Sequence, residues 1–147
     1  MATRTKPPEV AEYDIWSQGI ERRLYILASE ISQHIFDGHI PVQRVIVEHI
    51  PIPNDAPPEY FTAAEVDTDN NIIRIDTTTI LHNSSRTLIQ ALIHEMCHIE
   101  VLMKYRNQRL RVHGKVFWMI LIKRMAKLTP DIQKCLEEAW EKEETAM

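Results

Sequence analysis

The spacing of apolar and polar positions predicts a long helix at the start of the chain. Between Glu9 and Asp37, apolar side chains recur every three or four residues, as on one face of an amphipathic helix. Gly38 follows at the position where a helix often ends in glycine. The apolar positions of this face are Trp16, Ile20, Leu24, Leu27, Ile31 and Ile35.

A small sheet is predicted after this helix. Pro41–Ile50 alternates between apolar and polar residues, which is typical of a strand with one buried face. Tyr60–Val66 and Asn71–Asp76 lie on either side of the turn-forming residues 67–70, so this region is expected to be a β-hairpin. The proline-rich stretch Pro51–Pro58 cannot join a ladder and is expected to be a loop.

Three more helices are predicted in the second half of the chain. The first contains Leu88–Tyr105, is capped by Ser84 or Ser85, and carries an apolar stripe that would face a core. The second is Val116–Leu128, and the third begins at Thr129-Pro130-Asp131 and runs to about Glu144. The stripe of the first of these helices consists of Leu92, Met96, Ile99 and Met103. The tryptophans Trp16, Trp118 and Trp140 occupy helical core spacings.

This order of elements predicts an α+β protein with a single domain. The sequence has 147 residues, of which 44% are hydrophobic and 26% charged, so residues 9–147 can build one core and residues 1–8 are expected to be a disordered leader. The sequence shows no signal-peptide core and no apolar run long enough to cross a bilayer. Two lone cysteines fit a reducing compartment. We therefore expect a cytoplasmic protein, or a nuclear or nucleoid one if it associates with DNA, and not a secreted one.

The sequence His94-Glu95-Met96-Cys97-His98 carries the candidate chemistry. An HExxH pattern on a helix places two imidazoles one turn apart on the same face, where both can bind one zinc ion. Glu95 is then adjacent to the site and can act as the general base that takes a proton from the attacking water. Cys97 falls nearly opposite the histidine face and is expected to be a small core residue.

A catalytic zinc needs a third protein ligand, and the sequence can be searched for one by exclusion. The extended pattern HExxHxxGxxH fails, because Val101 and Lys104 stand where glycine and histidine are required. The next helix supplies no carboxylate, and Glu100 lies off the ligand face. His113 remains, at the start of the following helix.

The two segments His94–His98 and His113-Gly114-Lys115-Val116-Phe117 resemble the SprT-like metalloprotease domain, the family that includes Spartan. The resemblance extends from about Val42 to Leu128. It implies a zincin-like fold, with His94, His98 and His113 as zinc ligands and Glu95 as the catalytic residue. In the best-known members it also implies cleavage of proteins attached to DNA.

Charge along the chain suggests where DNA could bind. The net charge is −4, but eight basic residues and no acidic residue lie between positions 104 and 127. Such a region can attract phosphates, and the alternative is a solvated surface balanced by the acidic C-terminal stretch. No cysteine-rich zinc ribbon follows the last helix, so this region is the expected DNA contact. The basic residues are Lys104, Arg106, Arg109, Arg111, Lys115, Lys123, Arg124 and Lys127.

Three functions remain open at this point. The favoured one is a zinc-dependent endopeptidase that cleaves protein substrates, including DNA-associated ones, with the substrate paired to an edge strand of the hairpin. The alternatives are a non-catalytic SprT-like module that binds DNA or protein, and a structural zinc domain in which Cys97 is a fourth ligand. Glu95 favours the enzyme, because neither alternative needs a carboxylate there.

Overall fold

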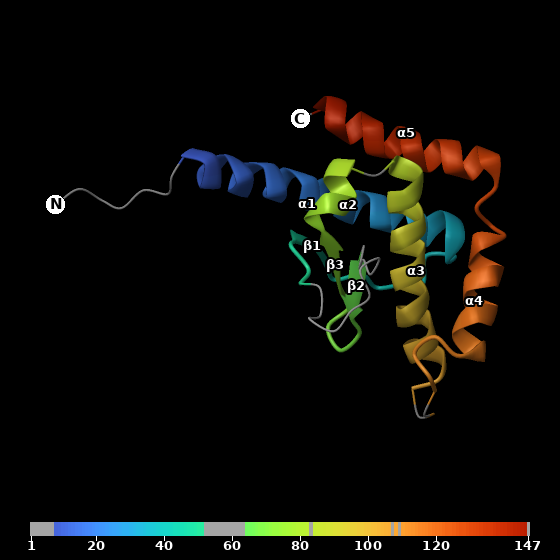
Figure 1. The fold of residues 1–147 in the computed structure, drawn as a ribbon. Helices are drawn as coiled ribbons and strands as arrows, with labels where there is room; N and C mark the ends of the chain where they lie inside the picture. The colour runs from blue at the N-terminus through green and yellow to red at the C-terminus, as the bar shows by residue number, and fades with distance from the viewer. Residues whose placement is uncertain (1–7, 52–63, 83, 107, 109, 147) are drawn as a thin grey trace.

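The computed structural model describes residues 8–51, 64–82, 84–106, 108 and 110–146 (Figure 1). Residues 1–7 of the predicted leader, residues 52–58 of the predicted proline-rich loop and residues 60–63 of the second predicted strand lie outside the described residues. Pro8, which was predicted to belong to the leader, is the first residue of a helix. The elements, in chain order, are α1 (Pro8–Ile35), β1 (Arg44–Glu48), β2 (Ala64–Asp67), β3 (Ile72–Asp76), α2 (Thr77–His82), α3 (Ser85–Lys104), α4 (Lys115–Met125) and α5 (Pro130–Ala146).

Helix α1 forms where the apolar spacing predicts it and buries the predicted face. Its side chains contact the sheet and α3 in one continuous core. The helix ends at Ile35, two residues earlier than predicted, because Asp37 and Gly38 adopt positive φ angles of 57° and 77°. The Gly38 N–H donates to the Ser32 carbonyl at 2.8 Å, which satisfies one of the last carbonyls of the helix.

The sheet has three strands in the order β1-β3-β2, and the predicted hairpin is confirmed. Strand β2 is antiparallel to β3, whereas β1 pairs with β3 in the parallel direction. The register places Val45 opposite Ile73 and Val47 opposite Ile75, and all four side chains are buried against α1 and α3. The mixed sheet therefore provides one wall of the core.

The short helix α2 was not predicted from the sequence. It begins directly after β3, and the Asp76 carboxylate accepts a hydrogen bond from the Thr78 N–H at 3.0 Å, as an N-cap does. Six residues are too few for apolar periodicity to show a helix, so only the cap residue signals it.

Helix α3 crosses the molecule beside the sheet and carries the HExxH segment (Figure 1). Its N-cap is Ser84, whose hydroxyl accepts from the Thr87 N–H at 3.2 Å. Three positions of the predicted stripe are buried, but Met103 is 45% exposed. The prediction for Met103 was wrong because the end of α3 packs against the core through Val101 and Tyr105 instead.

The last two helices pack mainly against different helices. Helix α4 lies beside α3, and α5 runs alongside α1 (Figure 1). On α5, Leu136 is fully buried and the Trp140 ring stacks on the Arg23 guanidinium, whose carbon lies 3.8 Å from the ring centroid. Trp118 on α4 is 48% exposed, so the prediction that it lies in the core was wrong. The face of α4 that is buried carries Phe117, Ile120 and Arg124 instead.

In the described part of the chain, no helix combines the length and the apolar character that a bilayer crossing requires.

Candidate metal centre

The structure brings three histidines together between α3 and the start of α4. His94 and His98 lie one turn apart on α3, and His113 approaches them from the α3–α4 connection. The Nε2 atom of His113 lies 3.3 Å from that of His94 and 3.2 Å from that of His98. Three nitrogen donors directed at one point are suited to a cation, because their lone pairs would otherwise face one another.

Electrostatics keep the α3 imidazoles neutral, which is the form that binds metals. Burial, followed by repulsion from His94 and His113, lowers the pKa of His98 to about 4. Burial, followed by repulsion from His113, also lowers the pKa of His94 below its usual value. At neutral pH these two rings therefore have free lone pairs.

Glu95 follows the first histidine and is buried. Burial, followed by repulsion from the Glu65 carboxylate on β2, raises the pKa of Glu95 to about 7. Removal from water disfavours the charged carboxylate, and a second acid nearby adds to the effect. Glu95 is therefore a carboxyl group that can both accept and donate a proton near neutral pH.

Phe117 supports the three histidines from beneath. Its ring stacks on that of His98 with centroids 4.3 Å apart, and its centroid lies 4.9 Å from that of His94 and 5.0 Å from that of His113. The ring is completely buried. Because a phenyl ring has no hydrogen-bonding group, it limits imidazole rotation without competing for the ring nitrogens.

Gly114 gives the chain the tight turn that delivers His113. The Gly114 N–H donates to the Arg111 carbonyl at 3.1 Å. A Cβ atom at position 114 would lie only 3.0 Å from Arg111 Cβ and 3.3 Å from the Arg111 carbonyl oxygen. A larger residue at position 114 would therefore require Arg111 to shift by a few tenths of an ångström.

A groove of about 870 Å³ opens over the histidines. Strand β2 forms one side with Glu65 and Val66, and α3 forms the floor. The α3–α4 connection forms the other side and contributes Arg111 and Val112. Tyr105 also lines the groove and packs partly against the core. The groove is open enough for a polypeptide segment to reach the histidines.

Two residues that could have completed a different site point elsewhere. Cys97 is buried in the core, and burial, followed by repulsion from Glu100, raises the pKa of its thiol to about 12. A thiol that holds its proton so tightly is a poor metal ligand. Glu100 is also buried, and it is paired with Arg124 rather than with the histidines.

The basic region is smaller on the surface than the sequence predicted. Arg124 is buried against Glu100, Lys104 pairs with the same carboxylate, and Lys127 pairs with Asp37 at 3.2 Å. Arg109 lies outside the described residues. The exposed cations that remain are Arg106, Arg111, Lys115 and Lys123.

The fold and the histidine cluster define an α+β protein with a candidate metal site between an HExxH helix and the helix after it. The SprT-like family model matches residues 28–135, which is most of the chain, and the chain belongs to the SprT-like family. This confirms the resemblance found in the sequence and extends it at both ends. Membership and the histidine cluster together support a metalloprotease-type function with a bound metal ion.

Among solved structures, the crystal structure of the metallopeptidase zymogen of Pyrococcus abyssi abylysin is similar to this chain. The two share 20% sequence identity with a TM-score of 0.44, over 78% of this chain and 95% of that one. No curated protein matches the chain.

Sequence reasoning missed two features of the site. Phe117 was identified as part of a motif but not as the support of all three rings, because the contact depends on how α4 packs. The Glu100–Arg124 pair was missed because its partners lie 24 residues apart and Arg124 was counted among surface cations. Arg124 recurs with Phe117 and Ile120 at spacings of three and four, which was the available signal that it faces the core.

Proposed function

We propose that this protein is a zinc-dependent endopeptidase. The observation that carries the proposal is the convergence of three histidine Nε2 atoms beside a buried glutamate at the floor of a groove. Three imidazoles form a ligand set typical of catalytic zinc, which keeps one position open for water or substrate. His94, His98 and His113 would hold the ion through Nε2.

The chemistry divides between the ion and the chain. A bound zinc ion supplies Lewis-acid polarisation and makes water more acidic. Glu95 takes the proton from the attacking water and later gives it to the leaving amine, which is general base and then general acid catalysis. Phe117 keeps the imidazoles oriented, so that little reorganisation is needed when substrate binds.

The sheet offers one suitable edge for an extended substrate. Strand β2 borders the groove, and in the described part of the chain it pairs with β3 alone. The opposite edge is blocked in part, because the Val47 N–H of β1 donates to the Glu21 carboxylate of α1 at 2.8 Å. A polypeptide that adds to β2 would lie across the histidines.

The test of the catalytic assignment is Glu95→Gln. We expect this variant to bind about one zinc per chain, as the wild type does, and to lose peptide cleavage, because an amide cannot accept the proton. Bound zinc is measured by elemental analysis and cleavage with an unfolded protein substrate. The matched variant His113→Ala should lose most of the zinc. Cleavage by Glu95→Gln at the wild-type rate would contradict the mechanism, and a wild type without cleavage that still binds DNA or protein tightly would favour the binding module.

We also propose that substrates are DNA-associated proteins and that DNA contacts the exposed cations beside the groove. Arg111 lines the groove itself, and Lys115 and Lys123 lie on the exposed part of α4. Each phosphate contact adds salt dependence, because binding releases counterions. Replacing Lys115 and Lys123 with glutamine should weaken duplex DNA binding and reduce the slope of log affinity against log salt by about 2 in a fluorescence anisotropy titration. An unchanged slope would place DNA elsewhere or exclude it.

A further inference from the structure

Helix α4, which follows the third histidine, packs on the core through one buried face and through partly buried side chains beside it, namely Val116, Leu121 and Met125. The buried residues of α4 are Phe117, Ile120 and Arg124, which recur at spacings of three and four along one face. Phe117 and Ile120 make apolar contacts, which have little directional preference. The contacts of Arg124 are therefore the ones that can fix how far along α3 the helix sits.

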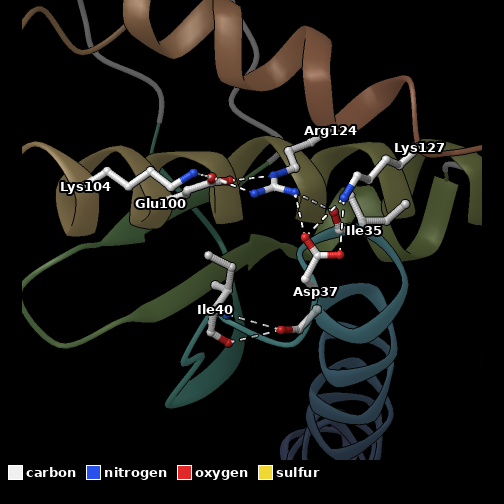
Figure 2. A network of polar contacts seen from close by, with 8 residues as sticks. Ile35, Asp37, Ile40, Glu100, Lys104, Arg124 and Lys127 are labelled. Carbon is white, nitrogen blue, oxygen red and sulfur yellow. Dashed lines mark hydrogen bonds and ion pairs between the residues drawn. The ribbon is translucent and has the colours of Figure 1, made fainter.

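Arg124 of α4 contacts both α3 and the end of α1 (Figure 2). Its contact with α3 is a planar, two-point contact with the Glu100 carboxylate. Its Nε atom donates to Glu100 Oε1 at 2.7 Å and its Nη2 atom donates to Glu100 Oε2 at 2.7 Å. Its Nη1 atom donates to the Ile35 carbonyl at the end of α1 at 3.1 Å, and Asp37 lies 3.7 Å from the same nitrogen. Glu100 and Arg124 are only 3% and 5% exposed.

Such a pair is better suited to fixing geometry than to adding stability. Removing two charges from water offsets much of their attraction, so a buried ion pair often stabilises a protein no more than apolar residues of similar size would. A two-point guanidinium–carboxylate contact, however, forms in one relative orientation. A slip of α4 by one turn, about 5.4 Å, would break both hydrogen bonds and carry His113 out of reach of His94 and His98.

We propose that Glu100 and Arg124 are positioning residues for the metal site: their contact sets the register of α4 on α3 and thereby places His113 beside the other two histidines. Glu100 is two residues after His98, on the other side of α3, and Arg124 is one helix length after His113. The pair thus joins α3, which carries His94 and His98, to α4, which follows His113, on the side of α3 away from the histidines. This inference rests on the proposed metal site.

The experiment compares zinc affinity with folding in matched variants. Arg124→Lys keeps the charge but loses the two-point contact, and the double variant Glu100→Leu/Arg124→Met removes both charges without leaving either buried alone. Lys127→Met is the control, because it removes a cation of the same network whose ion-pair partner among the described residues is the exposed Asp37. Zinc affinity is measured by competition with a chromophoric chelator, folding by circular dichroism, and ligand number by the visible absorption of the Co²⁺-substituted protein.

We expect Arg124→Lys and the double variant to stay folded and to bind zinc about tenfold or more weakly, the range found for residues that orient metal ligands. Their Co²⁺ spectra should show altered coordination, whereas Lys127→Met should match the wild type in both measurements. Folded variants that bind zinc as the wild type does would overturn the proposal. Loss of folding in both variants would also overturn it, since the pair would then maintain the fold as a whole. If the wild type itself binds no zinc, the proposed function fails rather than this inference alone.

Discussion

Asp76 is a single carboxylate that connects three parts of the chain. It is 3% exposed, and its Oδ1 atom accepts from the Ile50 N–H at 2.8 Å, just beyond the end of β1. Its Oδ2 atom accepts from the N–H and the hydroxyl of Thr78 in α2. Burial alone would raise the pKa of Asp76, but the hydrogen bonds from Thr78 and Ile50 and the nearby His49 lower it overall. The charged form is therefore favoured in the folded protein.

Replacing Asp76 with asparagine should lower the free energy of unfolding by about 1–3 kcal/mol at pH 7, because one acceptor oxygen becomes a donor facing N–H groups. Since the folded-state pKa is lowered, the wild-type advantage is fully present above the unfolded value of about 3.9 and is lost as the pH falls through the folded value. Urea unfolding at pH 7 and at pH 3 measures this difference. If the two proteins differ equally at both pH values, the Asp76 charge does not contribute.

At the scale of elements, local signals were enough for the long helices and the hairpin but not for their faces or partners. Helix α1 and the hairpin depend on periodicity and turn residues that lie within one stretch of sequence. Helix α4 is apolar almost all round, so spacing could not decide that Phe117 faces inward and Trp118 outward. The parallel pairing of β1 with β3 is a tertiary contact that no local pattern predicts.

In the candidate site too, local sequence patterns predicted some residues and not others. His94, Glu95 and His98 form a motif within one helix, so helical geometry alone predicted that they lie close together. His113 was found by excluding other ligands, and the structure places it beside the first two. The supports of the site, Phe117 and the Glu100–Arg124 contact, depend on the packing of α4 and could only be seen in the fold.

At the scale of the whole molecule, the core and the metal site are largely separate. The core runs through α1, the sheet, α3, α4 and α5, and it includes Phe117 of α4 and Leu136 of α5. The three histidines lie on the groove side of α3, half-buried or exposed. The protein should therefore fold without metal, and a bound ion should add to stability without being required for it.

Chelation tests this separation. We expect EDTA to leave the helical circular dichroism at 25 °C unchanged and to lower the melting temperature, because zinc at 1,000 times its dissociation constant stabilises the folded state by about 4 kcal/mol. Restoring zinc should restore the melting temperature. Collapse of the helical signal on chelation would instead identify a structural zinc domain, in which folding depends on the metal.

Trp118 is the exposed aromatic ring beside the metal site, with its centroid 6.3 Å from that of His113. The other two tryptophans, Trp16 and Trp140, pack partly against the core from α1 and α5. Because indole fluorescence responds to its immediate surroundings, Trp118 is an intrinsic fluorescence probe of the metal site. The arrival of a quenching ion such as Co²⁺, or of a polypeptide in the groove, can be followed in real time on the unlabelled chain.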